Sequence, residues 1–152
     1  MTDPLSFVST TPRHALPLLF SGQAQKEIFV NEAHARADLL LHPAVKGEVA
    51  APPANPLDGE SWLVADGAQG DFAGHDGAIA GRQAGVWIFT RPRDGMRVLD
   101  QATGQHVLFA KGWQREPAPA APSGGTTVDS EARAAIESVV IALQRTGIFP
   151  SE

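Results

Sequence analysis

The side chains that could do chemistry in this 152-residue chain include five histidines and 17 acidic residues. The chain has no cysteine, which excludes disulfides, thiolate metal sites and thiol catalysis together. No two histidines have the spacing of metal ligands on one helix or loop. They lie at His14, His34, His42, His75 and His106. The sequence therefore predicts no metal site.

His75 and Asp76 form the only adjacent pair of a histidine and a carboxylate. They lie within Gly-His-Asp-Gly, in which we expect Asp76 to bond its own backbone and Gly77 to take a positive φ. We interpret this segment as a turn, with a metal or catalytic contribution as the weaker alternative. His34 is interpreted as a polar helix residue that bonds toward Glu27, Asn31 or Asp38.

Signatures of known catalytic sites are missing from the sequence. There is no Gly-x-Ser-x-Gly elbow, phosphate-binding loop or dinucleotide fingerprint. Ser123 lies in a Ser-Gly-Gly stretch that could not hold a nucleophile in place. Glycosidases need only two carboxylates in a cleft, and nothing selects such a pair here. We predict that the chain is not an enzyme and has no cofactor, and keep glycan cleavage as an alternative.

Three tryptophans follow one another at nearly even intervals. Trp62 and Trp87 lie in apolar runs that read as strands, so we assign them to the core. Trp113 ends the apolar region, beside a proline-rich segment, and could be exposed. An exposed aromatic with polar neighbours suits sugar stacking. Trp113 with Lys111 is therefore the candidate glycan contact, with Gln114 beside it.

Charge and hydropathy restrict the partners. The net charge is −5, with no cluster of lysine and arginine, so nucleic acid is not an expected ligand. No segment approaches the roughly 20 apolar residues of a membrane span. The apolar run from Ala15 to Phe20 is too short for a secretion signal and contains Pro17. We expect synthesis in the cytoplasm.

Residues 21–42 are predicted to form a helix, with Ser21 as its N-cap and a stop before Pro43. At 100° per residue it has two apolar faces where one is usual. The wide face, expected to pack on its own domain, comprises Phe29, Val30, Ala33, Ala37, Leu40 and Leu41. The narrow face, expected to meet a second copy, comprises Ala24, Ile28, Ala35 and Leu39.

A polar stripe separates these two faces. We predict that it forms a structural polar face, bonding the backbone of the preceding arm or of the β region. The alternatives are a solvated surface and a ligand site. The residues of this face are Gln23, Lys26, Glu27 and Asn31.

The remaining chain divides by composition. Residues 1–20 read as an extended arm, loose or ordered on a neighbouring subunit through Leu5, Phe7 and Val8. Four prolines make residues 43–56 a linker or an extended edge. Residues 57–113 form one small antiparallel β module, because Asp-Gly and other Gly-containing turns separate short apolar runs. The predicted strands are 61–65, 78–80, 86–90, 96–100 and 106–110.

Residues 114–126 are a proline- and glycine-rich linker. Residues 127–146 then form a second, amphipathic helix with Asp129 as N-cap and a stop at Gly147. Its apolar residues include Ala132, Ile136, Val139 and Leu143, whose 4-3-4 spacing suits a helical bundle. The predicted oligomer interface thus consists of Ile28, Phe29, Val30, Leu39, Ile136, Val139 and Leu143.

Three motifs carry a resemblance. Gly-Gln-Ala-Gln-Lys-Glu followed by Asn-Glu-Ala, the segment Gly74 to Ala80, and Gly112-Trp113 resemble a domain-of-unknown-function family. That family is encoded in alphaproteobacterial prophages and gene transfer agents. Its members are similar to tail-fibre, baseplate or head-spike components of phage-like particles. The resemblance brings no catalytic residues.

We therefore expect an α+β protein with an N-terminal arm and helix, a β module, a linker and a C-terminal helix. The resemblance implies a structural, homo-oligomeric spike, fibre base or adaptor on the exterior of a particle. Expected partners are copies of itself, other particle proteins and, as a candidate, host polysaccharide. A carbohydrate-binding module is the main alternative.

Overall fold

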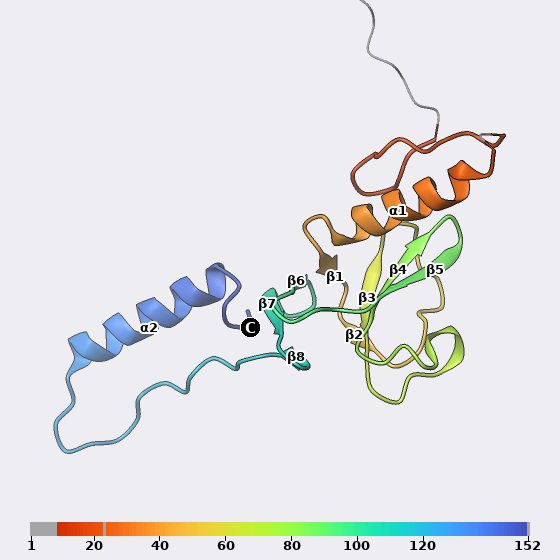
Figure 1. Ribbon diagram of the computed structural model, residues 1–152. Helices are drawn as coiled ribbons and strands as arrows, with labels where there is room; N and C mark the ends of the chain where they lie inside the picture. The colour runs from red at the N-terminus through yellow and green to blue at the C-terminus, as the bar shows by residue number, and fades with distance from the viewer. Residues whose placement is uncertain (1–8, 23, 152) are drawn as a thin grey trace, which may run out of the picture. The chain divides into compact units, whose positions relative to one another are not determined.

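The computed structural model describes residues 9–22 and 24–151 (Figure 1). Within these residues the chain forms two α-helices and eight short strands, so the α+β prediction is confirmed. It divides into two units, each with its own sheet. The first comprises the residues up to Pro43 together with Glu48–Pro92, and the second comprises Ala44–Gly47 and the residues from Arg93 onward. Leu5, Phe7 and Val8 lie outside the described residues.

The first helix, α1 (Lys26–Leu40), is shorter than predicted. Ala24 and Gln25 have φ angles of 56° and 65°, in the left-handed region, so the helix cannot begin before them. Ser21 is therefore not its N-cap, and Gln25 takes that position without a side-chain hydrogen bond. At the other end the helix stops at Leu40, before the predicted end at His42, and His42 has a φ of 46°, in the left-handed region.

The sheet of the first unit has the strand order β2-β3-β4-β5. Its strands are β2 (Glu48–Val49), β3 (Ser61–Val64), β4 (Ile79–Gln83) and β5 (Val86–Thr90). The pair β2–β3 is parallel and the other two pairs are antiparallel. A short 3₁₀ helix, η1 (Gly70–Phe72), brings Phe72 into a core with Val64, Ala78 and Ala80. Trp87 and Phe89 pack against this core.

Helix α1 contacts β5 and packs on this sheet (Figure 1) through the C-terminal part of its narrow face, whereas Ile28 of that face is 62% exposed. Ala35 and Leu39 are buried, and the Leu39 side chain fills the space above Gly81. A Cβ at Gly81 would come within 2.8 Å of Leu39 Cδ1, so this approach requires glycine. Phe29, on the wide face, is 76% exposed. The expectation that the wide face packs on the domain is therefore wrong, and Leu39 is not available to a second chain.

The sheet of the second unit has the order β1-β6-β7-β8. Its strands are β1 (Ala44–Val45), β6 (Arg97–Asp100), β7 (Gln105–Phe109) and β8 (Trp113–Gln114). Val45, Val98 and Val107 are buried in it. It repeats the pattern of the first sheet, since β1 pairs in parallel with β6 and the rest is antiparallel. The predicted single antiparallel module is thus two mixed sheets, because 43–56 supplies one parallel edge strand to each.

Helix α2 (Ser130–Arg145) is shorter than the predicted range 127–146 but has the predicted N-cap and stop. The Asp129 carboxylate accepts a hydrogen bond from the Ala132 backbone N–H at 2.9 Å. Gly147 follows with a φ of 73°. Of the helices in the described part of the chain, none combines the length and apolar character required to cross a bilayer.

Candidate functional site

His75 and Asp76, the adjacent pair noted in the sequence, take part in ring stacking and in a backbone hydrogen bond. In the described residues, His, Asp and Glu form no group of three or more that could hold a metal ion. The His75 ring stacks on Phe89, with centroids 3.7 Å apart and planes 11° from parallel. Asp76 Oδ1 accepts a hydrogen bond from the Ala68 N–H, and this bond lowers the pKa of the Asp76 carboxyl below its usual value. Gly77 has a φ of 72°, so the predicted turn is confirmed.

The polar stripe of α1 bonds the arm that precedes it. The Asn31 amide accepts from the Leu19 N–H at 2.8 Å and donates to the Leu19 carbonyl at 3.0 Å. Glu27 Oε1 accepts from the Gly22 N–H at 3.2 Å. These contacts are of the predicted kind, since side chains of the stripe bond the backbone of the arm. Lys26 is exposed, and Gln23 lies outside the described residues.

Other contacts of the arm differ from the sequence reading. A His34 ring nitrogen lies 2.7 Å from the Pro17 carbonyl, so the predicted bonding toward Glu27, Asn31 or Asp38 is wrong. His34 reaches backbone because the arm folds back over α1 and leaves a carbonyl above the ring. Thr10 and Pro17 form a bridge within the arm. The described part of the arm is therefore ordered on its own helix.

Asp38, which the sequence reading considered only as a polar-stripe residue and a partner of His34, is the polar centre of these contacts. It is 2% exposed and accepts three hydrogen bonds: from Thr11 Oγ1 at 2.7 Å, from the Arg13 N–H at 3.1 Å and from the His14 N–H at 2.7 Å. Arg13 also donates to the Asp38 and Leu39 carbonyls near the end of α1. The partners lie 24–27 residues earlier, so no local spacing reveals them. This cluster fastens the arm to α1.

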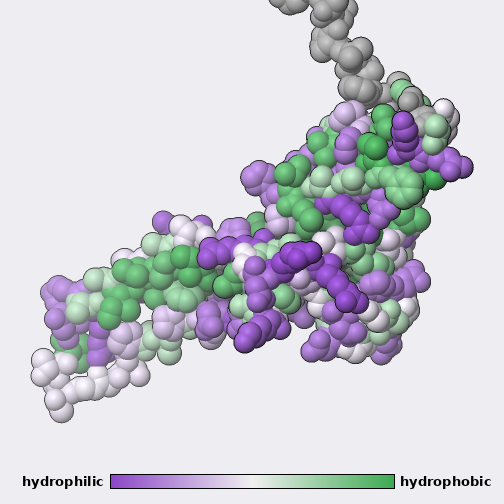
Figure 2. All heavy atoms as spheres, in the orientation of Figure 1, coloured by the Kyte–Doolittle hydropathy of each residue, from purple (hydrophilic) through white to green (hydrophobic). Residues whose placement is uncertain are grey.

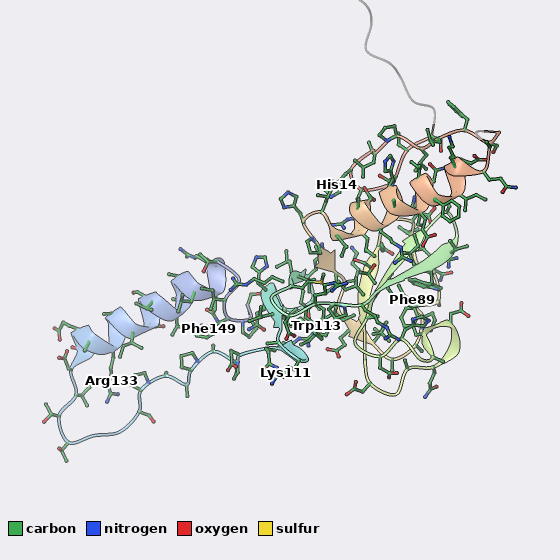
Figure 3. All side chains as sticks on the ribbon, in the orientation of Figure 1. His14, Phe89, Lys111, Trp113, Arg133 and Phe149 are labelled. Carbon is green, nitrogen blue, oxygen red and sulfur yellow. The ribbon has the colours of Figure 1, made fainter. Side chains whose placement is uncertain are left out.

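The candidate glycan contact lies in the second unit. The Trp113 ring meets Phe109 edge-to-face, with centroids 5.2 Å apart, and is half-buried. Lys111 is exposed, and its backbone, at a φ of 61°, donates to Asp94 Oδ1 at 2.8 Å (Figure 3). Only part of the indole is therefore open to a ligand.

Helix α2 exposes most of its apolar surface. None of its residues is buried, and Val139 is 57% exposed. Figure 2 shows hydrophobic residues running along this helix. Its C-terminal end is anchored: the His106 N–H donates to the Gly147 carbonyl, and the Gln105 amide donates to the Ile148 carbonyl. The apolar face formed by Ala132, Ile136, Val139 and Leu143, called the α2 seam below, is thus presented by a fixed helix end.

The linker runs beside α2 (Figure 1). Arg133 donates to the carbonyls of Pro122 and Gly124, so the linker is tied to the first turns of the helix. A groove of about 550 Å³ separates the two, with Ala118 and Pro119 on one wall and Ile136, Val140 and Gln144 on the other, so one residue of the α2 seam borders it. The linker therefore leaves most of the helix uncovered.

The comparison with protein families gives one match. The family model described as "Protein of unknown function (DUF2793)" matches residues 30–114, which is more than half of the chain. The chain belongs to this family. A search of the curated proteins gives no match.

The DUF2793 match begins within α1 and ends in β8, so it spans both sheets. Two of the motifs noted in the sequence, Gly74 to Ala80 and Gly112-Trp113, lie inside it, whereas Gly22 to Glu27 precedes it. Asp38 and the candidate contacts Lys111 and Trp113 also lie inside the matched region. Helix α2 lies outside it, so the α2 seam is an addition to the DUF2793 region of this chain.

Proposed function

We propose that this DUF2793 chain is a structural, homo-oligomeric component of a phage-like particle, such as a spike, fibre base or adaptor. The observation that carries the proposal is the exposed apolar surface of α2. The link to particles rests on the sequence resemblance described above. The proposal gives the chain no catalytic step.

The α2 seam needs a partner for energetic reasons. An isolated helix of this length is marginal in water, so its stability depends on covering its apolar side. Exposed apolar surface contributes about 25 cal/mol for each Å² removed from water. Ile136 and Val139 are both exposed, at 46% and 57%. Association through the seam would bury both side chains.

A second copy of α2 is the partner that fits the seam best. The 4-3-4 spacing places the four seam residues in the a and d positions of a short coiled coil. Ala135 and Ala142 flank the seam and allow close helix approach, while no ionisable side chain interrupts it. Every copy presents the same aliphatic surface, so identical helices can interdigitate.

The mass of the full-length protein in solution tests this association. Val139→Glu places a charge on the seam, and burying it in an interface costs several kcal/mol. Ala134→Glu adds the same charge on the opposite side of the helix and is the matched control. We expect larger assemblies for the wild type and the control than for Val139→Glu, which loses association through α2 and keeps its β-sheet circular dichroism. A monomeric wild type at the highest soluble concentration would contradict the proposal.

Immunolabelling of purified particles tests the location. We expect the chain on the particle exterior, and a reduced amount of the Val139→Glu chain per particle. Titration with host polysaccharide is the complementary measurement. Saturable binding that Trp113→Ala abolishes, together with absence from particles, would replace this proposal with a carbohydrate-binding module.

A further inference from the structure

Strand β5 has an open edge in the sheet of the first unit. It lies at the end of the order β2-β3-β4-β5 and, within residues 9–22 and 24–151, pairs only with β4. A two-residue turn, Ala84-Gly85, joins the two strands, with positive φ at both positions. In such a hairpin the residues flanking the turn form a hydrogen-bonded pair.

This register decides which backbone groups face outward. Alternation from the Gln83–Val86 pair directs Val86, Ile88 and Thr90 toward β4. The backbone of Arg82, which lies opposite Trp87, agrees with this register. Its N–H points away from β5 and donates to the Glu60 carbonyl on the far side of β4. The N–H and C=O groups of Trp87 and Phe89 therefore point away from the sheet. Among the described residues, the hydrogen bond they make is from Arg36 Nη1 to the Phe89 carbonyl, at 3.0 Å.

A groove runs beside this edge. Its volume is about 620 Å³, and it is lined by α1 on one side, including Glu32 and Arg36, and by Trp87, Phe89 and His75 on the other. The strand itself, Val-Trp-Ile-Phe-Thr, has no ionisable side chain. Sheet edges are commonly protected by lysine, proline or bulges, and β5 has none of these. Its side chains and its outward backbone groups both suit an added strand.

We propose that β5 of a second copy pairs antiparallel with β5 about a two-fold axis at Ile88. Trp87 of each copy then lies opposite Phe89 of the other, in the position where the two residues exchange both backbone hydrogen bonds. The Phe89 carbonyl can keep its bond to Arg36, because a carbonyl oxygen has two lone pairs. The two sheets become one continuous sheet, with both α1 helices on the same face.

Self-complementarity favours a second copy over a foreign strand. A single register pairs the outward N–H and C=O groups of both strands. This is possible because a two-fold rotation about Ile88 places Trp87 of one copy opposite Phe89 of the other, and the reverse. The groove rim carries an ion pair of opposite charges, Arg36 with Glu32 at 2.7 Å. After the two-fold rotation, each copy meets one cation and one anion of the other copy, Arg36 and Glu32. Such an isologous contact is closed, so it produces a dimer and not an extending sheet.

This contact uses the first unit alone and does not require the α2 seam. The test therefore uses the full-length Val139→Glu variant, in which association through α2 is removed. Hydrogen exchange of the Trp87 and Phe89 amides is followed by NMR against protein concentration, together with the mass in solution. We expect a dimer at high concentration, protection of both amides in the dimer, and loss of both on dilution.

Two substitutions sharpen the test. Val86 is 58% exposed on β5, and Val86→Lys adds a charge to the edge without entering the core. Leu57→Lys is the control, because Leu57 is 68% exposed and lies outside the strand. Val86→Lys should abolish the dimer and the amide protection, whereas Leu57→Lys should leave both unchanged.

Three outcomes would overturn the proposal. Fast exchange of both amides at every concentration would show that the edge stays open. Protection at a monomeric mass would assign the edge to another segment of the same chain. A dimer that Val86→Lys leaves intact would place the contact elsewhere. Each of these outcomes can occur whether or not α2 associates, so failure here is separate from failure of the α2 seam.

Discussion

The two helices of this chain obtain their support in different ways. Helix α1 buries Ala35, Asp38 and Leu39 within its own unit and is fastened to the arm by hydrogen bonds. Helix α2 has the cleaner amphipathic pattern and buries no residue. It is held by contacts at its C-terminal end and by the Arg133 bonds to the linker.

The difference shows that an apolar stripe does not reveal what covers it. In α1 the burial is small, and a buried carboxylate with three donors adds a specific attachment. In α2 the stripe is wide, and its own chain leaves it open to solvent. Stability of α1 is therefore a property of the monomer, whereas stability of α2 should depend on association.

The largest effect should come from removing the Asp38 carboxylate. Asp38→Ala leaves three hydrogen-bond donors of the arm without their acceptor, and bonds to a charged group contribute about 1.5–3 kcal/mol each. Allowing for solvent at the partly buried donors, we expect a loss of about 4 kcal/mol in the free energy of unfolding of the first unit. Urea denaturation followed by tryptophan fluorescence measures it, since Trp62 and Trp87 belong to this unit.

Glu32→Ala is the control for this change. Glu32 pairs with Arg36 on the surface of the same helix, and such exposed pairs contribute about 0–1 kcal/mol. A similar loss of stability in both variants would show that Asp38 does not fasten the arm.

The next largest difference should come from truncating one apolar side chain of each helix to alanine. Leu39 is 5% exposed, and Leu39→Ala should cost about 3 kcal/mol through lost contacts and a cavity above Gly81. Val139→Ala should change the unfolding free energy of the monomer by less than about 0.5 kcal/mol, because that side chain is largely exposed. Differential scanning calorimetry at low concentration provides the measurement. Equal destabilisation would mean that α2 packs on its own chain as firmly as α1 does.

The smallest effect concerns the surface turn at Asp76. Its folded pKa lies below the ordinary value of 3.8, mainly because the Ala68 N–H donates to the carboxylate. A lowered folded pKa means that the charged form stabilises the folded state above pH 3.8, and that this contribution is lost as the pH falls through the folded pKa. NMR titration should place the Asp76 midpoint below 3.8.

The stability difference between the wild type and Asp76→Asn should be present at neutral pH and shrink as the pH falls from 3.8 through that midpoint. A midpoint at or above the ordinary value would contradict the role of the Ala68 bond.

Local signals in the sequence were sufficient for much of the fold. The 86–90 strand agrees with β5 at both ends, because a turn at Ala84-Gly85 and the apolar run after it define the hairpin. Asp129 and Gly147 mark the limits of α2, because capping chemistry involves residues within one turn of the helix end. The GHDG turn follows from glycine conformation in the same way.

Contacts between distant segments were decided only by the tertiary structure. The periodicity of α1 showed two apolar faces, but only Ala35 and Leu39 of the narrow one are buried, where Leu39 approaches the backbone at Gly81. The parallel strands β1 and β2 pair with strands far along the chain or beyond a proline-rich loop, so no local pattern marks them. Asp38 is buried because the arm folds back to supply its donors. The open edge of β5 likewise exists because the sheet ends there, and a strand's own sequence does not state how many neighbours it has.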